Sequence, residues 1–423
     1  MRDPRLFRRP PRKQIGKSRA TSATSADKLE DIKVDLRWAA SIELATIPPY
    51  LTAMYSLKDS NGEDYRLMKA VVIEEMLHLA LVCNLMASIG ESPRFGPPHP
   101  SSAADDEVDP GHIVVPEYPG TLPLHIAEDV VIGLFPLSAG VAKDVFCQIE
   151  KPADGGYTGD QDLTIGEFYE RLQKEFDSLE PADIVDPRGE RQLDDSYYIG
   201  GGGGTLLPVT SKDDAREAIE QIKDQGEGNN PWRAGGFGQS WGQKFLYDVR
   251  PDGDYGPILN CNEPSHFERF RRIADRTVPV TGTRPMQPNP RTDALPEGSD
   301  VRRLSSLFDQ AYSLSLHYLE AAYSGSDCRD LFLRGMMPVM HGVLPLLARK
   351  LMDTPLVDAA NGKQTGRNAG PAFIYCADAR DPRALEKAAG ELKACFGPAE
   401  FAELMRILGD LPGLPSASPQ SAK

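Results

Sequence analysis

The chain of 423 residues is poor in the features that build disulfide frameworks, structural zinc sites and membrane spans. Its six cysteines are scattered and form no Cys-x-x-Cys pair, which indicates reduced thiols in a cytosol-like compartment. No run of about eighteen apolar residues is apparent, so no membrane span is expected. The net charge of −15 opposes nucleic-acid binding, which needs a basic face. A cytoplasmic protein with neither nucleic-acid nor membrane partners is therefore expected.

The first residues also lack the apolar segment of a secretory signal. They are rich in Lys and Arg, and Pro4, Pro10 and Pro11 oppose an amphipathic helix. We predict that residues 1–24 form a disordered basic arm, with organelle import as the alternative.

What the sequence does contain is helical periodicity with carboxylates in apolar positions. Residues from about 27 to 55 carry an apolar stripe at helical spacing, and Glu43 falls on that stripe. Pro48 and Pro49 follow within about one turn. They are expected to kink or break the helix, because proline removes a backbone donor.

A second helix is predicted from about residue 64 to 89, and its middle is apolar nearly all round. Glu74, Glu75 and His78 are the ionisable groups there, apart from a cysteine thiol. Unpaired buried charge is costly, so such groups are normally paired or bound to metal.

Residues 92–160 are rich in Pro and Gly with short β-like runs, and a long functional loop is expected there. The glycine run from Gly200 to Gly204 lacks the features of a P-loop or a dinucleotide fingerprint, so a flexible lid or turn is preferred to a phosphate site. Further helices of the same region are predicted at about 164–179, 211–225 and 262–275.

The domain organisation follows from these segments. A metal-binding domain is expected over residues 25–276, a Pro-rich linker over 277–300, an added helical layer over 301–413 and a disordered tail over 414–423. The helices expected in the added layer are 302–323, 331–352 and 383–411.

Two Glu-x-x-His pairs lie in separate halves of the chain, Glu75 with His78 and Glu263 with His266. Positions i and i+3 share a helix face, so each pair can reach one ion. An upstream carboxylate accompanies each pair, Glu43 for the first and Glu227 for the second. This is the layout of a four-helix di-metal carboxylate site, with two ions, iron or alternatively manganese.

Some alternatives stay open at this point. Glu220 is a substitute for Glu227, and Pro264 must lie in the first turn of its helix, which places Glu263 at the cap. Packing is the preferred interpretation of the late residues His317, Glu320 and His341 over a second metal or haem site. The groups expected behind the ligands are Glu74, Glu268 and Asp224.

An ordered set of segments resembles the ferritin-like family named for iminophenyl-pyruvate dimer synthase. That domain also occurs in the bisindole-forming enzymes of violacein, rebeccamycin and staurosporine biosynthesis. The resemblance covers roughly residues 28–275. The segments that carry it are 42–51 (IELATIPPYL), 74–78 (EEMLH), 164–169 (TIGEFY), 225–228 (QGEG) and 265–270 (SHFERF).

The resemblance implies a mainly α, ferritin-like four-helix bundle with long loop insertions, to which the C-terminal helices add a layer. It favours Glu227 over Glu220. The residues that it places at metal-site positions are Glu43, Glu75, His78, Glu227, Glu263 and His266.

The function expected from these patterns is that of a non-haem di-metal oxidase or oxygenase related to oxidative imine coupling. Its partners would be O₂ or peroxide and a small, amino-acid-derived metabolite, with a homodimer as one assembly. The alternatives are an iron-binding ferroxidase without an organic substrate and a scaffold with a degenerate site. The sequence assigns no catalytic residue.

Overall fold

The computed structural model describes most of the chain. The described residues are 25–98, 109–152, 164–197, 204–226, 264–275, 280, 282–358 and 362–415. The predicted N-terminal arm, most of the predicted tail, Glu227 and Glu263 lie outside them.

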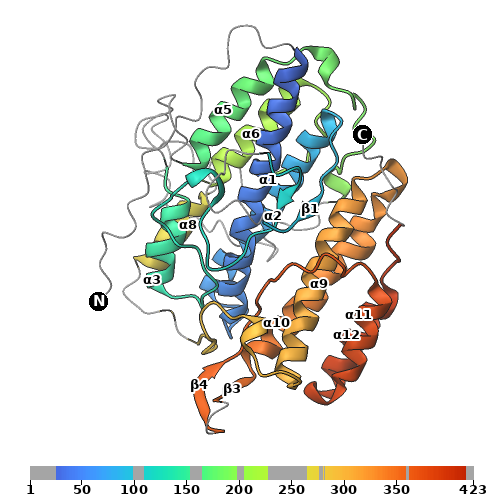
Figure 1. The fold of residues 1–423 in the computed structure, drawn as a ribbon. Coiled ribbons are helices and arrows are strands. Elements are labelled where there is room, and N and C mark those ends of the chain that lie inside the picture. The colour runs from blue at the N-terminus through green and yellow to red at the C-terminus, as the bar shows by residue number, and fades with distance from the viewer. Residues whose placement is uncertain are drawn as a thin grey trace.

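Two long antiparallel helices form the centre of the molecule (Figure 1), α1 (Ser25–Ser56) and α2 (Glu63–Ser88). The helix predicted over about 27–55 is confirmed, and a break at its two prolines is not found, because α1 continues through Pro48 and Pro49. Pro49 has no N–H for the carbonyl of Ala45. The hydroxyl of Tyr118 donates to that carbonyl at 2.8 Å, so tertiary structure replaces the lost hydrogen bond.

The region predicted as a long loop is partly regular. Strands β1 (Phe95–Gly96) and β2 (Ile113–Val114) pair in parallel. The expected loop then becomes helical from residue 139, which the sequence analysis missed. Ser138 caps this segment by accepting a hydrogen bond from the N–H of Val141. Its parts are α3 (Ala139–Val141), the π-helical turn η3 (Ala142–Phe146) and α4 (Cys147–Ile149).

Three further helices complete the N-terminal part, α5 (Ile165–Asp177), α6 (Lys212–Gly226) and α8 (His266–Ala274). Helix α5 packs on α1 and α6, and α8 packs on α2. The predicted start of the last helix was too early. Ser265 is its N-cap and accepts from the N–H of Glu268 at 3.3 Å, so Pro264 precedes the helix instead of lying in its first turn.

The C-terminal helices form a separate layer beside α1 and α2 (Figure 1). The predicted helix over 383–411 is in fact two helices, because Pro398 lies at the first position of the second, where its missing N–H costs nothing. The antiparallel pair β3–β4 was not predicted. The elements are η7 (Thr292–Ala294), α9 (Asp300–Ala322), the π-helical turns η9 (Phe332–Met336) and η10 (Val339–Val343), α10 (Leu344–Met352), β3 (Pro355–Val357), β4 (Gln364–Asn368), α11 (Pro382–Glu391) and α12 (Pro398–Asp410).

One hydrophobic core runs from α1 to α12. The segment predicted as a linker contributes to it, since Met286 is buried. Arg284 of the same segment donates to the backbone carbonyls of Tyr55 and Leu57 at 3.1 and 2.8 Å. The C-terminal layer is thus held to the bundle by apolar packing and by hydrogen bonds to the end of α1.

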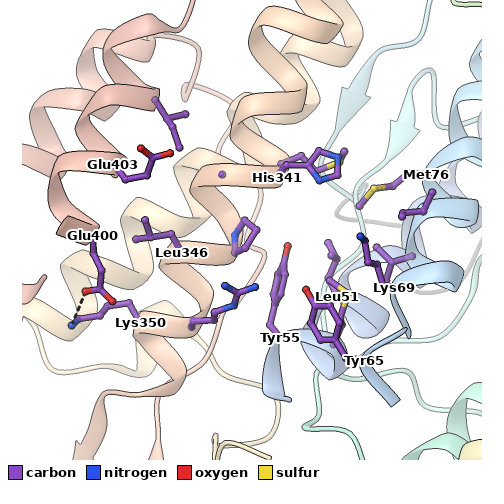
Figure 2. Close-up of a pocket in the computed structure, with 18 of the residues that line it drawn as sticks. Leu51, Tyr55, Tyr65, Lys69, Met76, His341, Leu346, Lys350, Glu400 and Glu403 are labelled. Carbon is purple, nitrogen blue, oxygen red and sulfur yellow. Dashed lines mark ion pairs between the residues drawn. The ribbon is translucent and has the colours of Figure 1, made fainter. Parts of the chain in front are cut away.

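A cleft of about 650 Å³ separates α1 and α2 from η10, α10 and α12 (Figure 2). An apolar recess of about 50 Å³ shares the lining residues Leu51, Met76 and Met340 with the cleft. These two cavities are on the side of the bundle that the C-terminal layer covers.

Two helical stretches of the described residues are long and apolar enough to cross a membrane, contrary to the expectation from the sequence. They are Glu63–Ser88 and Ser326–Met352. In the first, 94% of the apolar window is buried inside the protein, and in the second 56%. Length and composition are therefore weak evidence for a span here, because the core helices of a soluble protein pass the same test.

Candidate metal centre

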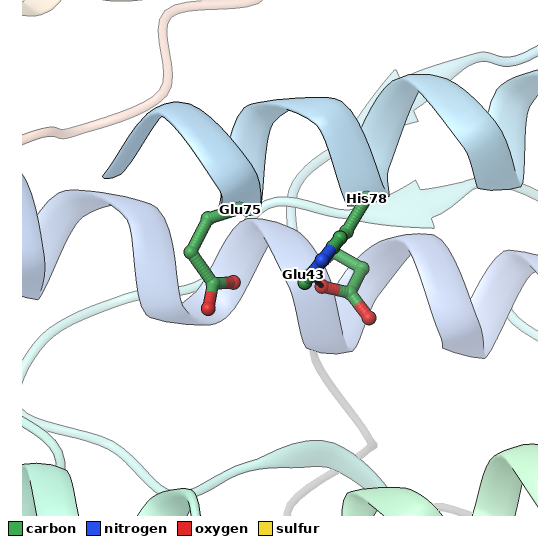
Figure 3. A group of neighbouring side chains, drawn as sticks. All are labelled: Glu43, Glu75 and His78. Carbon is green, nitrogen blue, oxygen red and sulfur yellow. Dashed lines mark ion pairs between the residues drawn. The ribbon is translucent and has the colours of Figure 1, made fainter. Parts of the chain in front are cut away.

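Three side chains of the two central helices meet between them (Figure 3): Glu43 of α1 with Glu75 and His78 of α2. All three are buried, and their potential ligand atoms lie within 4.8 Å of one another. We call this group the first triad. The periodicity of both helices places these residues on apolar, inward faces, as the sequence analysis expected.

A second group of the same kind shares one member with the first. Glu75 lies together with Glu150 and His266, again with ligand atoms within 4.8 Å and all three side chains buried. We call this group the second triad. Glu150 directly follows α4, and His266 is the first residue of α8. The carboxylate of Glu75 thus belongs to both triads and would contact both ions if each triad held one.

Both histidines present the same nitrogen to the carboxylates. Nδ1 of His78 lies 3.4 Å from Oε2 of Glu43, and Nδ1 of His266 lies 2.8 Å from Oε1 of Glu75. The two rings are stacked with centroids 5.4 Å apart. The buried Nδ1 of His266 nevertheless has no hydrogen bond of good geometry in the described structure. A metal ligand would leave its nitrogen in this condition, so the residues present fit a metal site.

The opposite nitrogen of each ring is held by a polar side chain. Nε2 of His78 lies 2.8 Å from Oε1 of Gln225, and Nε2 of His266 lies 3.0 Å from Oε2 of Glu74. Metal-binding histidines almost always donate their second N–H to such an acceptor, which fixes the tautomer and the ring orientation. Gly204 permits the first of these contacts, because a Cβ at this position, with φ of +89°, would lie 2.7 Å from the Gln225 amide nitrogen.

Glu74 is itself neutralised by a buried arginine. Arg269 of α8 donates from two nitrogens to the two oxygens of Glu74, at 2.5 and 3.0 Å. Burial opposes ionisation of Glu74, but Arg269 and His266 outweigh it and lower its pKa to about 2. The Glu74–Arg269 pair therefore links α2 to α8 directly behind the second triad.

Hydroxyl groups hold the carboxylates of both triads. Tyr169 of α5 donates to Oε1 of Glu43 at 2.5 Å, Thr46 of α1 to Oε2 of Glu75 at 2.5 Å and Tyr50 of α1 to Oε1 of Glu150 at 2.6 Å. Burial and the neighbouring carboxylates raise the pKa of Tyr50 and Tyr169 well above the ordinary value. Both phenols therefore keep their protons near neutral pH and act as donors.

Aromatic packing fixes the second triad. The rings of Tyr50, Phe146 and Phe270 come from α1, η3 and α8, with centroids 4.8 to 5.0 Å apart. Phe146 lies four residues before Glu150, and Phe270 lies four residues after His266. One aromatic cluster thus positions the two segments that carry these side chains.

The buried carboxylates of the two triads repel one another unless protons or metal cations compensate their negative charge. Burial and the nearby Glu150 raise the pKa of Glu75 to about 7. Burial opposes protonation of His266, but the neighbouring carboxylates of Glu150, Glu74 and Glu75 raise its pKa well above the ordinary value. In the absence of metal, protons therefore compensate the repulsion between the carboxylates. Oxygen and imidazole donors without thiolate suit iron or manganese.

The structure treats the six residues expected as ligands differently. It brings Glu43, Glu75, His78 and His266 together. Glu227 and Glu263 lie outside the described residues. Helix α8 begins at His266, and ligation by Glu227 and by Glu263 stays a prediction.

The alternative ligand Glu220 and the residues expected behind the ligands differ in where the structure places them. Glu220 is half-exposed and faces Lys223 at 3.4 Å, so it is not part of either triad. Glu74 does lie behind a histidine, as expected. Glu268 and Asp224 are not members of either triad, and their expected role behind the ligands stays a prediction.

Sequence reasoning missed Glu150, Gln225 and Arg269. A signal for Glu150 existed, because Ala142, Phe146 and Ile149 follow the capping Ser138 at helical spacing and lead to Glu150. The π-helical turn in this segment shifts the phase of the pattern, and such turns are frequent at functional sites. No local pattern distinguishes Gln225 or Arg269 from surface residues of their helices.

The late histidines are not brought together. His317 is buried on α9 with its Nδ1 2.8 Å from Arg380 and 3.9 Å from Glu320. His341 lines the cleft of Figure 2. Neither joins a group of metal-ligand side chains among the described residues.

Comparisons with known proteins place this geometry in a wider context. A family model described as Ferritin-like matches residues 36–275, the stretch that contains both triads. Among solved structures, the chain is similar to a ferritin-like protein from Caulobacter vibrioides, with 21% identity and a TM-score of 0.47 over 92% of this chain and 98% of that chain. No curated protein matches it.

Proposed function

Because this chain belongs to the Ferritin-like family, we propose that the two triads bind two metal ions, with Glu75 bridging them. The family includes di-metal carboxylate proteins built from Glu and Glu-x-x-His side chains on four helices. The observation that carries the proposal is the shared carboxylate between two triads whose histidines both present Nδ1 and are held at Nε2. The proposed ligands are Glu43, Glu75, His78, Glu150 and His266.

The activity proposed is that of a non-haem di-metal oxidase or oxygenase with iron, or alternatively manganese. A redox-active metal in this site supplies one-electron and O₂ or peroxide chemistry. The residues of the chain have supporting roles. Gln225 and Glu74 orient the imidazoles, and the hydroxyls of Thr46, Tyr50 and Tyr169 orient the carboxylates. The burial of the cluster excludes bulk water.

The substrate proposed is a small, amino-acid-derived molecule of secondary metabolism, and the reaction is related to oxidative imine coupling. The support for this is the resemblance of the segments around Glu43, Glu75 and His266 to the family of iminophenyl-pyruvate dimer synthase. Aromatic 2-imino acids are therefore the first substrates to test.

One observation favours a second candidate, ferroxidase activity without an organic substrate. Neither the cleft nor the recess described above is lined by a residue of the two triads. In that case the ions themselves would be the substrate.

Oxygen consumption separates these functions. The protein is loaded anaerobically with about two Fe(II) per chain and mixed with O₂, alone or with the imine of indole-3-pyruvate. Consumption that depends on the imine supports the oxidase. Consumption with Fe(II) alone, together with Fe(III) formation, supports the ferroxidase.

Matched variants provide the controls for this experiment. Glu75→Ala should abolish either activity, whereas Glu220→Ala should leave it unchanged because Glu220 faces solvent and Lys223. Undiminished activity in a folded Glu75→Ala protein, or no iron bound by the wild type, would refute the proposed centre.

A further inference from the structure

The apolar recess lies inside the protein, between the helix pair α1–α2 and the C-terminal layer. One wall comes from α1 and α2, and the other from α9, η9, η10 and the first residue of α10. All of its lining residues except Met76 are buried. The recess is therefore a cavity of the hydrophobic core and not a groove of the surface.

The lining of the recess offers little to a water molecule. Its polar side chains are those of Tyr312 and Ser315. The hydroxyl of Ser315 already donates to the carbonyl of Tyr312 at 2.6 Å, and the buried hydroxyl of Tyr312 makes no hydrogen bond with any residue that the structure describes. A buried water usually makes about three hydrogen bonds, and these two hydroxyl groups are too few for that. A non-polar molecule needs no such partners and is driven out of water by the hydrophobic effect.

The size of the recess limits its occupant to a very small molecule. A dry apolar cavity of about 150 Å³ binds one benzene molecule, and the recess has roughly a third of that volume. Its lining includes Met76, Met336 and Met340. Methionine is polarisable and flexible, so these side chains attract a non-polar guest through dispersion and adjust to its shape. A molecule of two or three atoms suits this space.

The recess lies next to the first triad. The residues directly after Glu43, Glu75 and His78 in the chain all line it. Successive residues of an α-helix point about 100° apart, so the triad and the recess use neighbouring faces of the same turns of α1 and α2. A molecule in the recess is thus held one helix face away from the candidate metal ligands.

We propose that the recess binds one molecule of a small non-polar gas and supplies O₂ to the metal centre. The binding follows from the size and the apolar lining of the recess, whereas the supply role rests on the proposed function. Both the oxidase and the ferroxidase consume O₂, so the role applies to either activity. No bond forms or breaks in the recess, and O₂ enters and leaves it unchanged.

Nuclear magnetic resonance of the metal-free full chain tests the gas site with O₂ as the probe. Dissolved O₂ is paramagnetic and speeds the relaxation of methyl groups close to it. With ¹³C-labelled methionine methyls, the relaxation is compared under N₂ and under O₂. The methyls of Met336 and Met340 should respond more strongly than those of Met68 and Met86, which are buried on α2 but do not line the recess. An equal response of all four methyls would overturn the gas site.

A variant that fills the recess tests its assignment. Ala80→Val adds two methyl groups to the wall and should abolish the excess relaxation at Met336 and Met340. Ala70→Val is the matched control, because Ala70 is a buried alanine of the same helix that does not line the recess. Circular dichroism checks that both variants fold. Excess relaxation that persists in folded Ala80→Val would overturn the assignment, and the comparison of methyls within the wild type decides the gas site by itself.

The supply role is tested with the iron-loaded protein and the O₂-consumption assay. Ala80→Val should raise the KM for O₂ more than it lowers kcat, and Ala70→Val should change neither. An unchanged KM for O₂ in Ala80→Val would overturn the supply role. A protein that shows the excess relaxation but binds no iron would refute the metal centre and the supply role and would leave the gas site in place.

Discussion

The first triad stands on two long, regular helices, whereas the second is assembled from the ends of short segments. Glu43, Glu75 and His78 lie in the middle of α1 and α2. Glu150 follows a short helix with a π-helical turn, and His266 is the first residue of α8. Regular helices set the first triad by residue spacing alone, but the second depends on how distant segments dock.

The supporting contacts differ in the same way. His78 is held by the neutral amide of Gln225, and His266 by a buried ion pair between Glu74 and Arg269. A buried pair costs desolvation and is strongly destabilising when one partner is removed. The second triad, which is built from short segments, therefore depends on a buried ion pair whose disruption costs more than the loss of the single hydrogen bond behind the first triad.

Removing the shared carboxylate should have the largest effect. We expect Glu75→Ala to lower the iron content from about two ions per chain to nearly none, because both triads lose a ligand. Elemental analysis after anaerobic loading and desalting measures this, with Glu220→Ala as the control that keeps its iron. Retention of one ion in Glu75→Ala would mean that Glu75 serves a single site.

Removing a carboxylate that belongs to one triad should cost about one ion per chain. We expect this loss in Glu43→Ala for the first triad and in Glu150→Ala for the second, measured in the same way. Full iron content in Glu150→Ala, together with loss in Glu263→Ala, would return the second ligand to the predicted Glu-x-x-His pair.

The supporting contacts can be compared through stability. Arg269→Met should lower the free energy of unfolding of the metal-free protein by about 3–5 kcal/mol, because Glu74 is left buried without its cation. Gln225→Leu should cost about 1 kcal/mol, since it removes one hydrogen bond at a half-buried position. Urea unfolding followed by circular dichroism measures both.

The matched control for the arginine is Arg272→Met on the same helix. Arg272 pairs with Glu63 at a partly exposed position, so its loss should cost less than about 1 kcal/mol. Equal effects of Arg269→Met and Arg272→Met would contradict the structural role of the buried pair.

A carboxyl remote from both triads, on α9, allows a test that depends on pH and does not involve the metal ligands. Burial raises the pKa of Asp309 on α9 from 3.8 to about 7, against hydrogen bonds from Thr292 and the N–H of Ile374. The folded state therefore binds the proton more tightly than the unfolded state, and its stabilising contribution is lost as pH rises from about 4 to 7. Asp309→Asn should flatten this part of the stability profile.

Metal provides the internal test of that prediction. The effect of Asp309→Asn should be the same with and without iron, because Asp309 belongs to neither triad. Unfolding midpoints at several pH values, with and without bound iron, measure it. A profile in Asp309→Asn as steep as that of the wild type would contradict the raised pKa.

Local pattern was enough for much of the fold and for the first triad. The apolar stripes of residues 27–55 and 64–89 located α1 and α2, and they placed Glu43, Glu75 and His78 on inward faces. The mainly α class and the ferritin-like bundle were predicted correctly. The break considered at the prolines of α1 is not found. The hydrogen bond from Tyr118 to the carbonyl of Ala45, which replaces the one that Pro49 cannot make, cannot be recognised from the local sequence.

The second triad could not be obtained in this way. Glu-x-x-His spacing pointed to Glu263, but the helix begins only at His266, and Glu150 comes from a segment more than one hundred residues earlier. The sequence pattern that leads to Glu150 was weak because a π-helical turn interrupts the helical spacing of the apolar residues and because the flanking sequence is rich in Pro and Gly.

By itself, the sequence determined which helices are buried and which of their carboxylates and histidines face inward, because a helix fixes side-chain direction through its period. Only the tertiary structure decided that Glu150 joins Glu75 and His266, that Arg269 compensates Glu74, and that a cleft lies between the bundle and the C-terminal layer. These contacts join segments far apart in the chain. Their geometry depends on the packing of whole helices, which no local pattern encodes.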